Sequence, residues 1–368
     1  MDTLTHALSG ALLGRVLARP ASAGTPPLHA AQAMAVGAVA AAFPDIDIVL
    51  GYASEIAYLR GHRGVTHSVL LAPLWALLLA VMMSRIGRLR RGGAPPWRAF
   101  YPVALGGLLI HIAGDFITQF GTMLLAPFSD RRFALGTTFI IDLVFSGILL
   151  GGLLASAIWR RSRVPAALAL VAVAGWVGVG WVGRSEALAA GRAYAQAQGL
   201  AMLTLDAAPR PASPFNWTVV IFDGRDYHFA HLNTRRSAPM QAGPEDNFIR
   251  RYSAPYLPVT QAVWERRAKF GDGEAVALAR SVWEAEAFAF YRWFALFPVL
   301  DRVEMAAPGG WRCAAFRDLR FEMPARAELP FRYGLCSAEV SGPWRLFKLV
   351  GGERRWLDPV GAWAAESK

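Results

Sequence analysis

Residues 62–83 read HRGVTHSVLLAPLWALLLAVMM, with two histidines and an arginine at the start of a long apolar run. A membrane-spanning helix needs roughly 20 mostly apolar residues, so this run is long enough to form one. Ionisable groups inside a membrane are costly and usually mark a functional site. The stretch therefore predicts a helix that spans a membrane, with a polar site at one of its ends.

The first half of the chain contains further apolar runs of similar length. Of the 368 residues, 54% are hydrophobic, and the mean hydropathy is +0.31, which is too apolar for an ordinary soluble enzyme of this size. Candidate helices lie at 4–19, 32–50, 65–83, 101–119, 136–158 and 164–183. We therefore expect an all-α polytopic membrane bundle of about six helices.

Charge divides the chain into two parts. Up to Arg184 there are 15 basic and 7 acidic residues, whereas from Ser185 onward there are 23 and 20, the charge density of a soluble domain. The second part also predicts helices at 259–269 and 274–297, and strands at 217–223, 227–233, 311–321, 331–340 and 343–350. We expect a membrane-embedded domain over residues 1–184, followed by a water-exposed, soluble α+β domain over residues 185–368.

The arginines predict the orientation in the membrane. They gather after the first, third and fifth candidate helices, at positions 15, 19, 85, 88, 90, 91, 98, 160, 161 and 163. Such an excess is typical of cytoplasmic loops. With six helices, residues 185–368 then lie outside the cytoplasm. Because the basic excess sits in short loops, membrane topology explains it better than a nucleic-acid partner does.

The second part carries no cluster with a chemical signature. Its two cysteines, Cys313 and Cys336, are too few for a zinc finger or an iron–sulfur cluster. They form either a disulfide, if this part lies in an oxidising compartment, or two buried thiols. His228 and His231 are three residues apart on a predicted strand, so they point to opposite faces and we interpret them as structural.

Polar residues recur in the apolar surroundings of the first part, and the predicted orientation places all of them in the outer leaflet. They are His6, Asp45, Asp47, His62, His67, His111, Asp115 and Asp142. Clustered aspartates repel one another and are costly in a membrane. A divalent cation would relieve both penalties, and histidine and aspartate are ligands for zinc, manganese and iron.

Spacing selects the candidate ligands. His111 and Asp115 are four residues apart, so on a helix they share one face. Asp142 is the group that we expect to orient a histidine. Zinc is the first choice of ion, with manganese or iron as the alternatives. The predicted metal ligands are His6, Asp45, His67, His111 and Asp115.

The first part signals no serine or cysteine nucleophile, since it contains neither a G-x-S-x-G motif nor a cysteine. Hydrolysis would then depend on a water that a metal ion deprotonates near neutral pH. We predict Asp47 or His62 as the base, with Asp45 as an alternative. Arg63 is predicted to neutralise a phosphate oxygen, and the other interpretation of Arg63 is a positively charged anchor at the membrane interface.

Four of these stretches together resemble the YdjM-like family of membrane-bound, metal-dependent hydrolases. They are M-D-x-x-T-H at residues 1–6, P-D-x-D at 44–47, H-R-G-x-T-H-S at 62–68 and H-x-x-x-D at 111–115. The resemblance covers roughly residues 1–185. It implies an integral protein of the bacterial inner membrane with hydrolase activity, and it says little about the second part of the chain.

Two functions fit these residues. The first is a hydrolase that acts on a lipid or lipid-linked phosphoester, because such a substrate reaches a membrane site laterally. The second is a transporter, or a metal-binding membrane protein without catalysis. Transporters usually place ionisable groups near the midplane between repeated halves, whereas these residues crowd one side and no repeat is visible, which favours the hydrolase. A third interpretation makes the second part a partner-binding domain.

Overall fold

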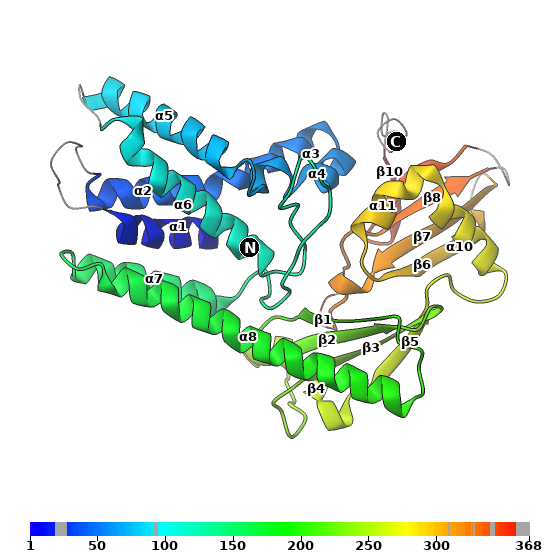
Figure 1. The fold of residues 1–368 in the computed structure, drawn as a ribbon. Coiled ribbons are helices and arrows are strands. Elements are labelled where there is room, and N and C mark those ends of the chain that lie inside the picture. Colours follow the sequence, from blue (N-terminus) through cyan, green and yellow to red (C-terminus); the bar gives the residue numbers. More distant parts are fainter. Residues whose placement is uncertain are drawn as a thin grey trace. The chain divides into compact units, whose positions relative to one another are not determined.

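The computed structural model describes residues 1–18, 28–91, 95–307, 310–324, 326, 328–338 and 343–357. The chain divides into two compact units, Met1–Arg184 and Ser185–Lys368. The first unit is helical, and the second contains two β-sheets (Figure 1). Of the arginines that predict the orientation, Arg19 lies outside the described residues, and at positions 88, 90 and 91 only the helical backbone is described.

The first unit consists of α-helices joined by short 3₁₀ segments. In chain order these are α1 (Thr3–Leu17), α2 (Ala30–Ala42), η1 (Phe43–Val49), α3 (Leu50–Ala53), α4 (Glu55–Gly61), η2 (Val65–His67), α5 (Ala72–Arg91), α6 (Trp97–Phe116), α7 (Leu143–Ile158) and α8 (Val164–Ala197), which continues into the second unit. Side-chain caps start several of them. Asp2 accepts a hydrogen bond from the backbone N–H of Thr5 at 3.0 Å, and Ser54 accepts one from Ala57 at 2.9 Å.

Three helical stretches are long and apolar enough to cross a membrane, namely Ala30–Ala53, Trp97–Phe116 and Val164–Ala197. A fourth span results if Glu55–His67 and Ala72–Gly87, which meet at a bend of 79°, count as one. α1 and α7 comprise only 15 and 16 residues, fewer than the roughly 20 that a span needs. The prediction of about six spans is therefore not confirmed, although each predicted segment contains a helix.

Glycines allow α1 and α2 to pack with their backbones in contact. A Cβ atom added at Gly10 would lie 2.2 Å from the carbonyl oxygen of Gly37, and one added at Gly37 would lie 2.1 Å from that of Gly10. Small residues at helix contacts are common in membranes, where close van der Waals packing drives association. α6 packs on both helices and α5 packs on α6, so the buried apolar residues of α2, α5 and α6 form one core (Figure 1).

The helix directions give the first unit two chemically different ends. α6 runs antiparallel to α1, because Gly106 of α6 faces Leu17 while Gly114 faces His6. At the end where α1 stops, the buried Arg15 donates to the carbonyl of Ser162 at 2.9 Å, in the arginine-rich loop between α7 and α8. The described arginines of the basic loops thus lie at one end, and the histidines and aspartates lie at the other.

The second unit contains a first sheet of five strands. These are β1 (Thr204–Pro209), β2 (Asn216–Phe222), β3 (Asp226–Asn233), β4 (Leu257–Pro258) and β5 (Trp264–Ala268). The order is β1-β2-β3-β4, and β5 also pairs with β3. The hairpin of β2 and β3 turns at Asp223 and Gly224, where the φ angle of +105° suits a glycine.

A second sheet is an antiparallel meander in the order β10-β9-β8-β7-β6. Its strands are β6 (Pro298–Ala307), β7 (Trp311–Asp318), β8 (Tyr333–Ser337), β9 (Arg345–Val350) and β10 (Glu353–Trp356). Three short helices accompany the sheets, α9 (Phe248–Ser253), α10 (Ala275–Glu284) and α11 (Ala289–Phe294), which gives the unit its α+β composition. Cys313 of β7 lies directly opposite Cys336 of β8, and a disulfide joins them.

Two predicted elements of the second unit are wrong. The helix predicted at 259–269 is a 3₁₀ turn, η3 (Val259–Gln261), followed by β5, because this strand pairs with β3 and Trp264 stacks on Tyr194 at 3.9 Å between ring centroids. The helix predicted at 274–297 breaks at Ala285, which is extended with ψ of 138°. Residues 339 and 340 of the strand predicted at 331–340 lie outside the described residues.

Candidate metal centre

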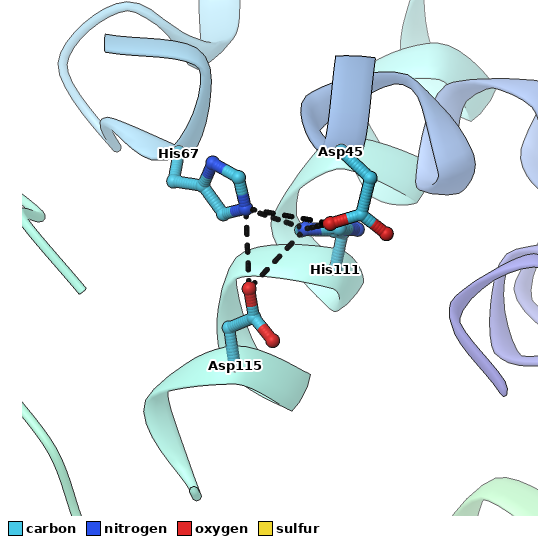
Figure 2. Close-up of side chains that lie close together, drawn as sticks. All are labelled: Asp45, His67, His111 and Asp115. Atoms are coloured by element: carbon cyan, nitrogen blue, oxygen red, sulfur yellow. Dashed lines mark hydrogen bonds and ion pairs between the residues drawn. The ribbon is translucent and has the colours of Figure 1, made fainter. Parts of the chain in front are cut away.

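Four side chains from three separate segments meet at the end of the first unit opposite the basic loops. Asp45 comes from η1, His67 from η2, and His111 and Asp115 from the last turns of α6 (Figure 2). One nitrogen or oxygen atom of each residue lies within 4.8 Å of those of the other three. His67, His111 and Asp115 are at most 1% exposed, whereas Asp45 is 17% exposed. The cluster is therefore buried with one member near the surface.

Local structure explains how these residues are presented. His111 and Asp115 occupy positions i and i+4 of α6 and share a face. η1 continues α2 directly, so Asp45 lies at the end of that helix. The loop that carries His67 is held by two backbone hydrogen bonds: Met123 donates to Arg63 at 2.9 Å, and Val69 donates to Leu124 at 3.0 Å.

The inward-facing atoms are close together. The Nε2 atoms of His67 and His111 are 2.9 Å apart, and Oδ2 of Asp115 lies 3.1 Å from the first and 3.5 Å from the second. Oδ1 of Asp45 lies 3.9 Å from Nε2 of His67 and 3.7 Å from Nε2 of His111. Figure 2 shows these four atoms pointing toward one another.

The opposite atoms of three of these side chains already have partners. Nδ1 of His111 donates to the carbonyl oxygen of Ala41 at 2.5 Å. Nδ1 of His67 lies 3.4 Å from a carboxylate oxygen of Asp47, and Thr3 donates to Oδ2 of Asp45 at 2.6 Å. Because both histidines keep their proton on Nδ1, their Nε2 atoms carry a free electron pair.

Asp115 completes this pattern. Its Oδ1 is contacted by the Met1 amino group, by Nη2 of Arg63 at 2.9 Å and by Nε2 of His6 at 3.2 Å. Among the described residues, nothing donates a hydrogen bond to its buried Oδ2. Electron pairs from two nitrogens and two carboxylate oxygens thus face one another without a proton between them. A divalent cation is the partner that this donor set fits.

A family model described as YdjM inner membrane protein matches residues 1–187, more than half of the chain. The chain belongs to this family. The uncharacterized protein YfhP of Bacillus subtilis (strain 168) is 29% identical over 174 residues, which cover 45% of this chain and 48% of the relative. The chain thus spans about half the length of this relative. No solved structure gives a significant match.

The candidate metal centre lies within the part of the chain that matches the YdjM family. This protein is therefore a member of an inner membrane family whose helical unit holds a possible metal-binding site. The match ends near the boundary between the two units, so the family says little about the sheets of the second unit.

The structure separates the other predicted site residues by what they contact. His6 lies outside the group of four, because it contacts Oδ1 of Asp115 and stacks on His111 at 3.7 Å between ring centroids. Asp47 accepts a hydrogen bond from Nδ1 of His62 at 2.9 Å and also faces His67. Arg63 is 2% exposed and is paired with Asp115. In this YdjM-family protein, these residues surround the four candidate ligands.

Asp142 serves a helix rather than a histidine, which corrects its predicted role. Its Oδ1 accepts hydrogen bonds from the backbone N–H groups of Val144 and Phe145, both at 2.9 Å, and so caps α7. Its Oδ2 accepts one from the indole of Trp176 at 2.8 Å. The aspartate appears in an apolar stretch because a helix begins there.

Two supporting residues were missed. Thr3 holds Asp45, and Thr66 lies 3.0 Å from Nδ1 of His67 through its hydroxyl oxygen. Thr3 precedes His6 by three residues, which places both on one face of α1. That spacing was a usable signal for Thr3. For Thr66 the sequence instead suggested a helix cap, because it directly precedes the long apolar run.

Proposed function

We propose that this protein is a membrane-embedded, metal-dependent hydrolase. The observation that carries the proposal is the arrangement around the four candidate ligands: each offers one unprotonated atom to a common centre while its other polar atom is held from behind. Side chains fixed in this way bind an ion without losing much further freedom. This supports a metal centre over a group of histidines and aspartates that only bond to one another.

Asp45, His67, His111 and Asp115 would hold the ion. Two nitrogen and two oxygen donors suit zinc, our first choice, and also manganese or iron. When bound, the ion would acidify a water molecule and stabilise negative charge that develops on the substrate.

His62 is the proton acceptor in this proposal. Since Nδ1 donates to Asp47 at 2.9 Å, the free electron pair is on Nε2. Tyr58 stacks on the imidazole at 4.8 Å between ring centroids, and Phe120 lies against its edge at 5.4 Å, so the ring is held in place. His62 is 17% exposed and its ring centroid lies 6.0 Å from that of His67. Nε2 is therefore placed to take a proton from water beside the centre and pass it to solvent.

Asp47 and Arg63 are positioning residues in this proposal. Asp47 orients the imidazoles of both His62 and His67. Nη1 of Arg63 donates to Thr118 at 2.8 Å, and Nη2 lies 2.9 Å from Asp115. Because the guanidinium is 2% exposed, these contacts support a role in holding Asp115 better than the predicted contact with a phosphate oxygen.

A lipid or lipid-linked phosphoester is the substrate that we propose. The segment that carries Asp45 exposes apolar side chains beside the site: Ile46 is 52% exposed, Ile48 is 63% exposed and Tyr52 is 92% exposed. Asp47, in contrast, is 5% exposed. Aspartates that face inward and apolar groups that face outward suit a segment at the boundary of lipid and water. An amphipathic substrate would reach the centre along that boundary.

The metal centre and the second unit would face the outside of the inner membrane. Two independent features support this orientation. The described arginines of the basic loops lie at the end opposite the metal centre, and cytoplasmic ends carry such an excess. The disulfide between Cys313 and Cys336 is of a kind that persists in an oxidising compartment such as the periplasm.

Metal content is the first measurement. The full-length protein, purified in detergent, is depleted of metal, incubated separately with zinc, manganese and ferrous ions, and analysed by mass spectrometry. We expect about one ion per chain in the wild type, lost in His67→Ala and Asp115→Asn. Asp130→Asn is the matched control, since Asp130 is exposed and lies outside the cluster. A wild type that stays empty with every ion would overturn the metal centre.

Hydrolysis is then assayed with the loaded protein in vesicles that contain phosphatidic acid, phosphatidylglycerol or a polyprenyl diphosphate. We expect release of phosphate or headgroup that requires the ion, and a reduced rate in His62→Gln with metal content unchanged. Full metal loading without cleavage of any substrate would refute the hydrolase and retain the metal centre. Uptake of the ion into the vesicles by the wild type would then favour the transporter.

A further inference from the structure

A hollow lies between α7 and α8, away from the metal centre. Its volume is about 600 Å³, within the range of ~300–1,000 Å³ that is usual for small-molecule sites. Small residues line one wall, Gly151, Gly152 and Ala155 of α7, and Leu168 and Ala172 of α8 contribute to the other.

Glycine positions explain how the hollow forms. A Cβ atom added at Gly152 would come within 2.3 Å of Cβ of Ala169, so α7 and α8 touch at this point. A Cβ atom added at the adjacent Gly151 would meet nothing within 4 Å. The two helices are therefore fixed together by one close contact, and the missing side chain beside it leaves an apolar groove.

The groove ends at a basic loop. Trp159 and Ser162 line it where α7 ends and α8 begins, and Arg160 and Arg161 between them are exposed. Arg15 fixes this loop from behind, because its guanidinium donates to the carbonyls of both Arg160 and Ser162. Nε of Arg160 donates to a carbonyl of its own helix at 3.1 Å, which leaves its other donors for a ligand. The end of an apolar groove thus carries two exposed positive charges.

We propose that this groove binds an anionic phospholipid, with one acyl chain against α7 and α8 and the phosphate on Arg160 and Arg161. Both parts of the ligand follow from the lining: apolar surface for the chain, and guanidinium groups for the phosphate oxygens. Basic pockets between membrane helices at the cytoplasmic side recognise acidic headgroups in this way. The proposal is independent of the metal centre and of the hydrolase.

Lipid binding is tested by native mass spectrometry of the detergent-purified, full-length protein titrated with phosphatidylglycerol, with phosphatidylcholine as the uncharged comparison. Arg160→Gln/Arg161→Gln should weaken phosphatidylglycerol binding by roughly 30-fold, at about fivefold for each charge. Arg85→Gln/Arg98→Gln removes the same charge from exposed positions near the other basic loop and should bind as the wild type. Gly151→Leu fills the groove and should also abolish binding with both arginines present.

Each outcome decides a part of the proposal. Equal binding of the two phospholipids by the wild type, or equal loss in both double arginine variants, would overturn it in favour of unspecific attraction. Loss in Arg160→Gln/Arg161→Gln with normal binding in Gly151→Leu would refute the groove as the acyl-chain site. Thermal unfolding in detergent controls for folding, since exposed arginines should be replaceable without a change in Tm.

Discussion

Asp47→Asn removes the charge of the carboxylate that connects His62 to His67 while preserving its size. Asp47 accepts hydrogen bonds from Nδ1 of His62 and from the backbone N–H of Arg63, both at 2.9 Å, and its Oδ2 lies 3.4 Å from Nδ1 of His67. All three partners present an N–H group, so the amide nitrogen of asparagine must face a donor. We expect the loss of at least one hydrogen bond to a charged group, which contributes about 1.5–3 kcal/mol.

That free energy corresponds to a decrease in metal affinity of roughly 10- to 100-fold, the range found when a residue that orients a metal ligand is replaced. The affinity of detergent-purified protein for zinc and manganese is measured by competition with a chromophoric chelator. Asp45→Asn, which removes a proposed ligand, should bind more weakly still. Asp130→Asn carries the same substitution outside the cluster and should bind as the wild type.

Wild-type affinity in Asp47→Asn, combined with weak binding in Asp45→Asn, would refute the argument that Asp47 orients His67. Thermal unfolding of the metal-free proteins separates this outcome from a general loss of structure. A reduced Tm with unchanged affinity would show that Asp47 stabilises the loop before His67 and does not contribute to the metal centre.

Three further predictions concern stability. Arg63→Ala should destabilise the metal-free protein by roughly 3 kcal/mol in thermal unfolding, because Asp115 stays buried with one cation fewer, and added zinc should restore part of the loss. Reduction of the disulfide between Cys313 and Cys336, which are 23 residues apart, should lower the free energy of unfolding by about 3 kcal/mol, measured in denaturant with and without a reductant. Burial, together with a nearby arginine, lowers the pKa of His231 from 6.5 to about 3. Since the unfolded chain binds this proton and the folded chain does not, the free energy of unfolding should fall as the pH drops from 6.5 toward 3. His231→Gln should flatten that part of the profile in urea unfolding.

Much of the candidate metal centre could be predicted because its residues stand in short motifs within apolar sequence. His111 and Asp115 needed only the helical spacing, and Asp45 and His67 followed from the penalty for placing ionisable groups in a membrane. The sequence could not separate His6 from the ligands. That distinction depends on Asp115, whose two oxygens face different ways, and a spacing rule has no access to this.

The helix count and two elements of the second unit depended on tertiary structure. Residues 136–142 are apolar enough to extend a span, but Asp142 caps α7 and the helix begins only at Leu143. The run 264–268 carries charged residues typical of a helix, yet it forms β5 because an edge of β3 is available for pairing. Propensity is a weak guide wherever a neighbouring strand offers hydrogen bonds.

The distribution of the four candidate ligands over η1, η2 and α6 has a consequence for how the protein is made. Asp45 and His67 leave the ribosome well before Asp115, and α5 must enter the membrane before α6 can follow. A nascent chain that stops before α6 offers only half of the donor set. Metal loading is therefore a late step of biogenesis, and an ion acquired then would lock the end of α2 to α6 once both helices are inserted.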